Sequence, residues 1–375
     1  MRIGQLIPWT IALSLVLDAT TRLIPIDMFS FRAWEPLSLA AGPTGPFEAD
    51  RNYINPLTHG DLSSAGRYSD LRQYHLEYFS TDHWGFRNTV TGSPDRAAGW
   101  LLVGDSFGVS SGVLDRNTLA SQLARLSGER VYNGSASRPL PLNDIRFTSG
   151  RLGMKEGVVV YEFMERQGMP TVARAENARD FRDGPPRPEP SLLERYRVWR
   201  KSVSVSRLQI LAGWGWEFID AKIGSTPRDA NPQPADTVSY ELFNGRTMLF
   251  YKQDVDLALD PYRQISPDYL LWLKSELGKL NLQLVVLLVP NKYSVYGSLV
   301  KDRGAVLPSN LPLAQFADRL KAQGVFVVNV TDALTKQATA DLPKDQYVYF
   351  IDDSHWNERG IGVAAQALVE AWKVR

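Results

Sequence analysis

The sequence predicts an α/β fold in which helices cover a central parallel sheet. Two observations predict it. Short apolar runs of strand length alternate with amphipathic, helix-length stretches from residue 100 onward, and one run, Gly157 to Phe163, is almost continuously apolar. Strands that are buried on both faces of a parallel sheet have this composition. Because ligands of such sheets bind at the carboxyl ends of the strands, the residues at those ends are the first candidates for function.

The N-terminus resembles an export signal. Met1-Arg2 is followed by the uncharged apolar stretch Ile3 to Leu17, which is shorter than the roughly 20 residues of a full membrane span. No small-residue cleavage site follows. We therefore expect residues 1–25 to form an uncleaved signal anchor in the cell inner membrane, with the rest of the chain on the periplasmic side. A buried N-terminal helix of a soluble protein is the alternative.

The rest of the chain divides into a lead-in and a domain. Residues 26–95 show weak periodicity and many turn formers, which predicts an extended lead-in packed on a domain of residues 96–375. Pro-rich, charged residues near 180–190 predict an insertion around 170–260, and Asn244-Gly245 predicts a hairpin there. The other expected strands are 100–103, 130–132, 157–163, 283–289 and 325–330, and the expected helices are 117–126, 192–211, 266–280, 311–323 and 357–373.

Composition excludes several classes of function. The chain has 44% hydrophobic residues and a net charge of +1, without long basic runs, so we expect no nucleic-acid partner. It has no cysteine, which excludes disulfides, thiolate nucleophiles and cysteine-ligated metals.

The turn Gly104-Asp105-Ser106 follows the predicted strand 100–103 and offers a candidate nucleophile. A serine hydroxyl needs a histidine to take its proton and a carboxylate to orient that histidine. Of the four histidines, His355 alone lies within the strand and helix pattern after this serine. A helix N-cap is the alternative for Asp105-Ser106, but Asp352-Asp353-Ser354-His355-Trp356 at the opening of the last helix favours a catalytic pair.

An oxyanion hole would complete such a site. The backbone N–H of Ser106 is the first expected donor, since the serine opens a helix at a strand end. Asn133-Gly134, after the next strand, is the expected second donor, because glycine lets the backbone approach a ligand closely. An ordinary Asn-Gly turn is an equally good interpretation.

These motifs resemble the SGNH/GDSL hydrolase superfamily and, within it, the alginate O-acetyltransferase group of AlgX/AlgJ-type SGNH-like proteins. Gly104-Asp105-Ser106 and Asp353-Ser354-His355-Trp356 carry the resemblance. Two further segments support it, Tyr161 to Arg166 and Val289 to Tyr296. The resemblance implies a three-layer α/β/α flavodoxin-like SGNH fold, an acyl-serine intermediate on Ser106, and His355 as general base and then acid.

The resemblance also bears on the orienting carboxylate. Asp353 fits the Asp-x-His-Trp form, whereas Asp352 fits the three-residue spacing of many SGNH hydrolases, so Asp353 is predicted and Asp352 is the alternative. The roles of two basic residues remain open. Arg166 would hold a substrate carboxylate or hydroxyl, or pair with Glu162 or Glu165 as scaffold, and Lys292 would lie at a sugar-binding edge or in a solvated loop.

The leading hypothesis is a periplasm-facing O-acetyltransferase that acts on hydroxyls of an exported polysaccharide. The resemblance implies that a membrane-bound O-acyltransferase relays the acetyl group, and no metal or other cofactor is expected. One alternative is an esterase or deacetylase of the same fold, in which water resolves the acyl-enzyme. A second is a polysaccharide-binding assembly subunit without catalysis.

Overall fold

The computed structural model describes residues 41–65, 68–89, 98–168, 170–181, 237–301 and 307–375, together with positions 13, 16, 20, 32, 37 and 38. The expected anchor, residues 1–25, and the expected helix 192–211 therefore lie almost wholly outside the described residues. Within the described part, no helix combines the length and apolar character that a membrane crossing requires.

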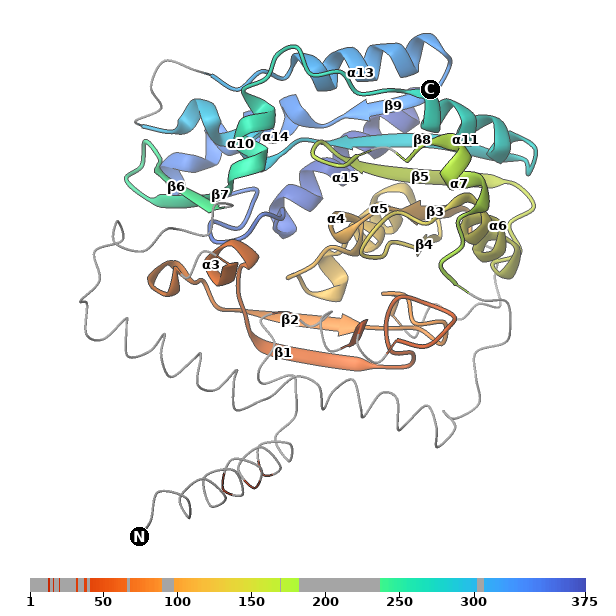
Figure 1. The fold of residues 1–375 in the computed structure, drawn as a ribbon, viewed down its shortest axis with the longest axis horizontal. Helices are drawn as coiled ribbons and strands as arrows, with labels where there is room; N and C mark the ends of the chain where they lie inside the picture. Colours follow the sequence, from red (N-terminus) through yellow and green to blue (C-terminus); the bar gives the residue numbers. More distant parts are fainter. Residues whose placement is uncertain are drawn as a thin grey trace, which may run out of the picture.

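A five-stranded sheet forms the centre of the fold, with the strand order β4-β3-β5-β8-β9 (Figure 1). All four strand pairs are parallel, which confirms the predicted parallel α/β fold. The order is that of a flavodoxin-like doubly wound sheet. The strands are β3 (Trp100–Val103), β4 (Val131–Asn133), β5 (Gly157–Met164), β8 (Leu282–Val289) and β9 (Phe326–Asn329).

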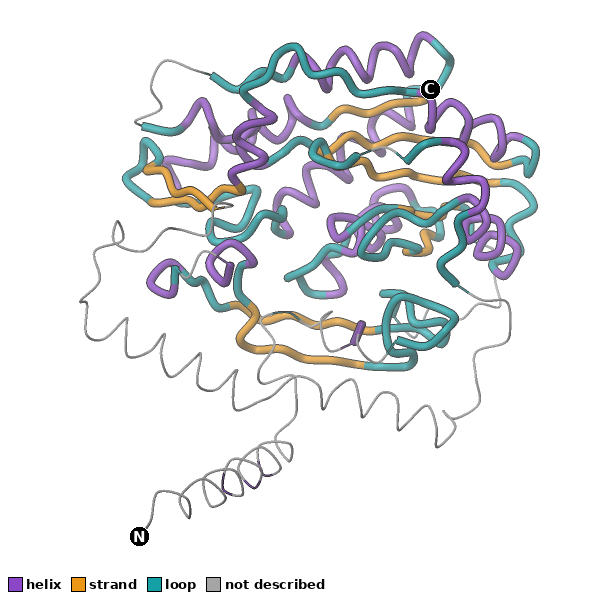
Figure 2. The backbone as a smooth tube through the Cα atoms, in the orientation of Figure 1, coloured by secondary structure: helices purple, strands orange, loops and turns teal. Residues whose placement is uncertain are grey.

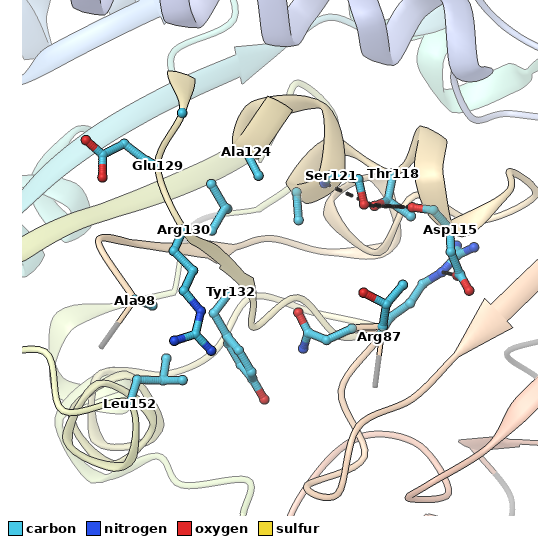
Figure 3. Close-up of a pocket in the computed structure, with 15 residues that line it drawn as sticks. Arg87, Ala98, Asp115, Thr118, Ser121, Ala124, Glu129, Arg130, Tyr132 and Leu152 are labelled. Carbon is cyan, nitrogen blue, oxygen red and sulfur yellow. Dashed lines mark hydrogen bonds and ion pairs between the residues drawn. The ribbon is translucent and has the colours of Figure 1, made fainter. Parts of the chain in front are cut away.

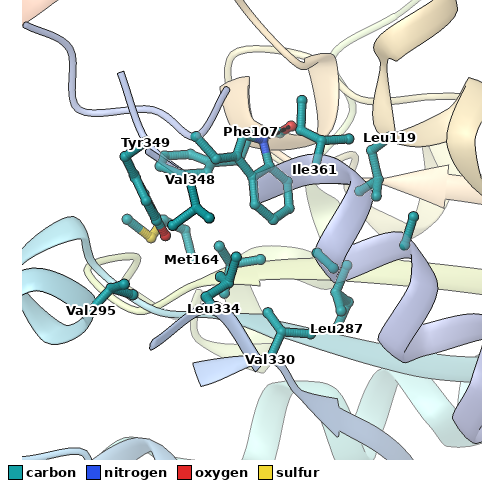
Figure 4. Packing of buried hydrophobic residues seen from close by; sticks show 14 of the residues in the cluster. Phe107, Leu119, Met164, Leu287, Val295, Val330, Leu334, Val348, Tyr349 and Ile361 are labelled. Carbon is teal, nitrogen blue, oxygen red and sulfur yellow. Dashed lines mark hydrogen bonds between the residues drawn. The ribbon is translucent and has the colours of Figure 1, made fainter. Parts of the chain in front are cut away.

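Alternate strand residues point to opposite faces of the sheet, and each face packs on its own set of helices. One face contributes Leu102, Val160 and Leu287 to a cluster that also contains Phe107, the residue after Ser106 (Figure 4). The helices on this face are α5 (Leu119–Ser127), α14 (Thr331–Asp341) and α15 (Glu358–Lys373).

The second face carries Leu101, Val159 and Val286, which pack in a separate cluster. Its helices are α6 (Leu142–Arg151), α11 (Asp268–Gly278) and α13 (Leu311–Ala322). Figure 2 shows the resulting arrangement, with helices enclosing the strands of the central sheet. Because helices cover both faces of the sheet, polar side chains can gather only at the ends of its strands.

Local signals in the sequence set several helix ends. The Thr118 side chain accepts a hydrogen bond from the Ser121 N–H and caps α5, and the Asn357 side chain caps α15 through the N–H groups of Arg359 and Gly360. Such caps satisfy backbone donors that have no partner within the helix. Helix α5 ends at Gly128, whose φ of 77° lies in the left-handed region, where glycine is favoured.

In the described residues, two antiparallel strand pairs lie outside the central sheet. The first pairs β1 (Asn52–Thr58) with β2 (His75–Ser80). The second pairs β6 (Thr237–Glu241) with β7 (Thr247–Tyr251) across the expected Asn244-Gly245 turn. The remaining elements are short: α3 (Asp61–Ala65), α4 (Ser106–Val109), α7 (Val172–Asn177), α10 (Lys252–Ala258), α12 (Lys292–Tyr296), and 3-10 turns at Ser69–Leu71, Asp115–Asn117, Gly297–Leu299 and Leu342–Lys344.

The lead-in segment packs on the domain next to the serine turn. Phe47, Tyr53 and Phe79 form a buried cluster with Val109, the last residue of α4. The Arg87 guanidinium donates to four backbone carbonyls, including those of Val109 and Ser110. These contacts hold the C-terminal end of α4 and so support the position of Ser106 at its start.

Candidate active site

Ser106 lies where β3 ends and α4 begins. The Asp105 carboxylate accepts a hydrogen bond from the Phe107 N–H at 2.8 Å and caps this helix. The Ser106 N–H is the first amide of α4, a position without a partner inside the helix. No group of the described residues accepts a hydrogen bond from it, so it is available to a substrate oxygen.

His355 and Asp353 lie in the turn before α15 and face the serine. His355 Nε2 is 2.7 Å from Ser106 Oγ, and His355 Nδ1 is 2.8 Å from Asp353 Oδ1. Because a carboxylate can only accept, Nδ1 carries the hydrogen and Nε2 is left to accept the serine proton. The structure thus brings together the three residues that the sequence singled out, in the order of a serine triad.

The imidazole is held in its neutral form. His355 is buried, and burial together with the Arg32 guanidinium lowers its pKa from 6.5 to about 3. Its ring lies 4.6 Å from that of Phe107, centroid to centroid. A neutral ring at neutral pH is the form that can act as a general base.

Asp352 does not contact the imidazole. Its Oδ2 accepts hydrogen bonds from the Gly60 N–H at 2.8 Å, the Gln73 N–H at 3.0 Å and the Ser63 hydroxyl at 3.2 Å. Asp352 therefore fastens the lead-in segment to the turn before α15. Of the two adjacent aspartates, Asp353 is the one placed to orient His355.

The expected role of Asn133 and Gly134 as second oxyanion donor is corrected by the structure. The Gly134 N–H donates to the Leu102 carbonyl at 2.8 Å, because the parallel pairing of β3 and β4 continues beyond β4. The Asn133 N–H donates to Asn88 Oδ1 at 2.9 Å, and its side-chain amide donates to the Gly108 carbonyl at 3.3 Å. Both residues are thus engaged in holding the turn, as in the ordinary-turn interpretation.

Arg166 lies at the edge of the site. Its guanidinium forms an ion pair with Asp254 at 2.6 Å and donates to Ser354 Oγ at 3.2 Å. The expected partners Glu162 and Glu165 are occupied elsewhere: Glu162 accepts from the N–H groups of Asp105 and Gly108, and Glu165 from Asn291 and Ser294. About a fifth of the Arg166 side chain is exposed, at 21%, and its guanidinium lies near the rings of Phe107 and Tyr251.

Lys292 belongs to the interior, which corrects both interpretations made from the sequence. The side chain is fully buried, and its ammonium donates to the carbonyls of Leu249, Ile351 and Asp353 at 2.6, 3.1 and 2.9 Å. Burial lowers the pKa of this lysine to about 7. Lys292 cannot reach a substrate in this position; instead it fixes the backbone of the residue that orients the histidine.

Two charged residues of the lead-in also reach the site, and sequence analysis did not predict them. Asp61 accepts hydrogen bonds from the N–H and hydroxyl of Ser354, both at 2.7 Å. Arg32 forms an ion pair with Asp353. Burial opposes ionisation of Asp61, but Arg32, His355 and Ser354 outweigh it and hold the pKa of Asp61 below its usual value.

One group of described residues offers metal-ligand atoms. Asp61, Asp353 and His355 each present one such atom within 4.8 Å of the others. The Arg32 guanidinium contacts all three residues. A positive charge is therefore already present among these ligands, and the donor set does not fit a cation that would have to share this space.

A cavity of about 380 Å³ lies elsewhere, against α5 and the edge strand β4 (Figure 3). Arg130 and Tyr132 lie beside Leu152 in its wall. None of the residues that line it is Ser106, Asp353 or His355. The cavity is therefore separate from the triad.

Comparison with known proteins finds a family match for part of the chain. Residues 249–375 match the family described as ALGX: SGNH hydrolase-like domain, acetyltransferase AlgX. No curated protein matches the chain significantly. The matched part contains Asp353 and His355 but not Ser106. Over residues 249–375 the chain is therefore similar to the SGNH hydrolase-like domain of the acetyltransferase AlgX, which confirms the resemblance that its motifs predicted.

Proposed function

We propose that this protein is a serine-dependent O-acetyltransferase that moves an acetyl group, through an acyl-serine at Ser106, to hydroxyls of an exported polysaccharide. The observation that carries the proposal is the unbroken hydrogen-bond chain from Asp353 through His355 to Ser106, with steps of 2.8 and 2.7 Å. The similarity to an acetyltransferase domain over residues 249–375 supports it.

The geometry supports a two-step transfer. Ser106 Oγ attacks the acetyl carbon while His355 Nε2 takes the hydroxyl proton, and the imidazolium then gives that proton to the leaving group. An acceptor hydroxyl next loses its proton to Nε2 and attacks the acyl-serine, which restores the Ser106 hydroxyl. The Ser106 N–H, which has no acceptor among the described residues, stabilises the oxyanion in both steps.

Arg166 is the group we assign to the substrate. Its side chain is partly exposed, and its guanidinium donates to Ser354, the residue between Asp353 and His355 in the sequence. A guanidinium suits hydroxyl and carboxylate oxygens of a carbohydrate because it presents several donors in one plane.

The location and partners are part of the same proposal. Residues 1–25 would anchor the chain in the inner membrane with the domain on the periplasmic side, and a membrane-bound O-acyltransferase would supply the acetyl group. Full-length protein should then fractionate with membranes, resist high salt and be released by detergent. A mature N-terminus beyond about residue 20 would contradict the anchor.

The nucleophile is tested with p-nitrophenyl acetate. Ser106→Ala should abolish p-nitrophenol release and leave the far-ultraviolet circular dichroism unchanged, since the hydroxyl is the attacking group. Ser137→Ala, at an exposed serine, is the matched control and should retain full activity. Substantial turnover by folded Ser106→Ala protein would refute the assignment.

Transfer is then separated from hydrolysis by adding an oligosaccharide acceptor at millimolar concentration. Acetylated sugar should appear in the mass spectrum at the expense of acetate, because a bound hydroxyl gains effective molarity that water lacks. Acetate release that no acceptor alters would favour the esterase. A folded wild-type protein that binds oligosaccharide without any turnover would favour the assembly subunit.

A further inference from the structure

Arg32 comes from the lead-in segment and ends inside the site. Its side chain is buried, and its guanidinium contacts residues from three parts of the chain. Nη1 donates to Ser111 Oγ at 2.8 Å, and Nη2 pairs with Asp353 Oδ2 and lies 3.7 Å from Asp61 Oδ1. An arginine in this position links the lead-in, the segment after α4 and the turn before α15.

The two carboxylate oxygens of Asp353 accept hydrogen bonds from different groups. Oδ1 accepts from His355, while Oδ2 accepts from Arg32 and from the Asp61 N–H at 3.2 Å. A carboxylate bound at one oxygen can still rotate, but one bound at both is fixed in its plane. Arg32 therefore restrains the orientation that Asp353 gives to the imidazole.

Arg32 also acts on the charge of the ring. Its Nη1 lies 3.2 Å from His355 Nδ1. Since Nδ1 already donates to Asp353, this contact joins two donor groups and is electrostatic. The guanidinium opposes a positive imidazole, and so does Arg166, whereas Asp61 and Asp105 favour one. Among these neighbours, Arg32 has the largest charge effect on His355.

We propose that Arg32 is a positioning residue of this site: it fixes the Asp353 carboxylate that orients His355. The inference rests on the proposed function for its effect on turnover. It also means that Arg32 acts in the active site although it lies far outside the family match, which begins at residue 249.

The test compares Arg32→Ala and Arg32→Lys with Arg51→Ala, a matched control at an exposed arginine. Arg32→Ala should lower kcat for p-nitrophenyl acetate on the order of 10-fold to 100-fold, part of what loss of a triad carboxylate costs, with little change in KM. Added guanidinium chloride at low concentration should restore part of kcat. Arg32→Lys should lower kcat less than Arg32→Ala does, because lysine keeps the positive charge. It should still fall below the wild type, because lysine lacks the planar guanidinium.

The pH profile separates positioning from mere packing. Removing the guanidinium should move the acid limb of kcat/KM to higher pH, since the imidazole is then easier to protonate. Arg32→Lys should move it less. Unchanged kcat and an unchanged acid limb in folded Arg32→Ala protein would overturn the proposal.

A nuclear magnetic resonance titration of His355 in the resting protein keeps this test independent of the reaction. Arg32→Ala should raise the pH at which the ring titrates and weaken the Nδ1–H signal of its bond to Asp353. If Ser106→Ala proves fully active, the proposed function fails, yet this titration still tests Arg32. If the ring titrates as in the wild type, the Arg32 proposal fails whatever the reaction.

Discussion

Asp353 Oδ1 accepts two hydrogen bonds from His355, one from its backbone N–H and one from ring Nδ1, each at 2.8 Å. The first is the turn that an aspartate makes with the amide two residues further on. That turn brings the ring of the same residue back to the same oxygen. The Asp-x-His spacing thus joins the backbone turn and the ring tautomer at one carboxylate oxygen.

The role of Asp353 can be measured directly. Asp353→Asn should lower kcat on the order of 10²-fold to 10⁴-fold, because an amide stabilises the wrong tautomer and no longer balances the imidazolium. Steady-state kinetics with p-nitrophenyl acetate give the value. Asp352→Asn is the matched control: it should leave kcat much closer to the wild type and lower the unfolding midpoint, since this residue binds Gly60, Ser63 and Gln73. A larger kcat loss at Asp352 would reverse the assignment.

Substrate contact by Arg166 can be separated from its ion pair. Arg166→Gln should raise KM for the sugar acceptor and also destabilise the protein, because Asp254 is left buried without its cation. The double variant Arg166→Gln with Asp254→Asn should recover the stability. If Arg166 binds the acceptor, KM in the double variant stays high. A wild-type KM there would show that the arginine serves only Asp254.

The lowered pKa of Lys292 predicts that the free energy of unfolding rises with pH. Its pKa is about 7 in the fold, against 10.5 for the ordinary group, so between these values the unfolded chain binds more protons than the native one. The free energy of unfolding gains at most about 1.4 kcal/mol per pH unit from this residue in that window. Urea unfolding of the wild type at pH 7.5 and 9.5 measures the slope.

Lys292→Met should be less stable at both pH values, since the backbone carbonyls that the lysine nitrogen bonds lose their donor, and should show a smaller slope. Lys321→Met, at an exposed lysine, should keep the wild-type slope. Equal slopes in wild type and Lys292→Met would contradict the buried, weakly basic lysine.

Glu162 provides the opposite case. Burial, followed by the nearby Asp105 carboxyl, raises the pKa of Glu162 well above its usual value, so the native carboxyl keeps its proton to a higher pH than the unfolded chain does, and stability falls as pH rises above that usual value. Glu162→Gln should therefore keep activity and be at least as stable as the wild type at pH 8. Its amide oxygen can accept from Asp105 and Gly108, as the carboxyl does. Glu162→Ala should lose about 1–3 kcal/mol through these unsatisfied amides, and a comparable loss in Glu162→Gln would mean that the carboxyl is ionised.

Much of the fold could be predicted because its signals are local. The apolar run of β5, the Asn-Gly turn between β6 and β7 and the long amphipathic α15 each lie within a residue or two of their expected bounds. Helices α6 and α14 were not predicted. Their mixed faces, with Asn143-Asp144 in one and Thr331-Asp332 in the other, carry a weak periodicity, and packing on the sheet decides their structure.

The site was predictable where chemistry follows sequence spacing and not where it depends on tertiary contact. Ser106, Asp353 and His355 stand in recognisable motifs. Arg32 meets Asp353 across 321 positions, from a segment without periodicity, so no pattern could indicate it. Lys292 stands among tyrosines in a segment typical of a surface loop, and only the convergence of three carbonyls makes its burial tolerable. The sequence predicts a ligand for the Gly134 amide, but the structure pairs that amide with β3. This pairing depends on the register between β3 and β4, which no local pattern sets.

The pairing of β5 with β8 joins two halves of the chain that a cut between residues 181 and 237 would separate. The eight residues of β5 match the eight of β8 in register, so neither piece alone closes the sheet. Ser106 would stay on one piece and Asp353 with His355 on the other. Ester cleavage would then report reassembly of the two pieces, which makes this fold a candidate for a split-enzyme sensor whose signal is the chemistry of the rejoined site.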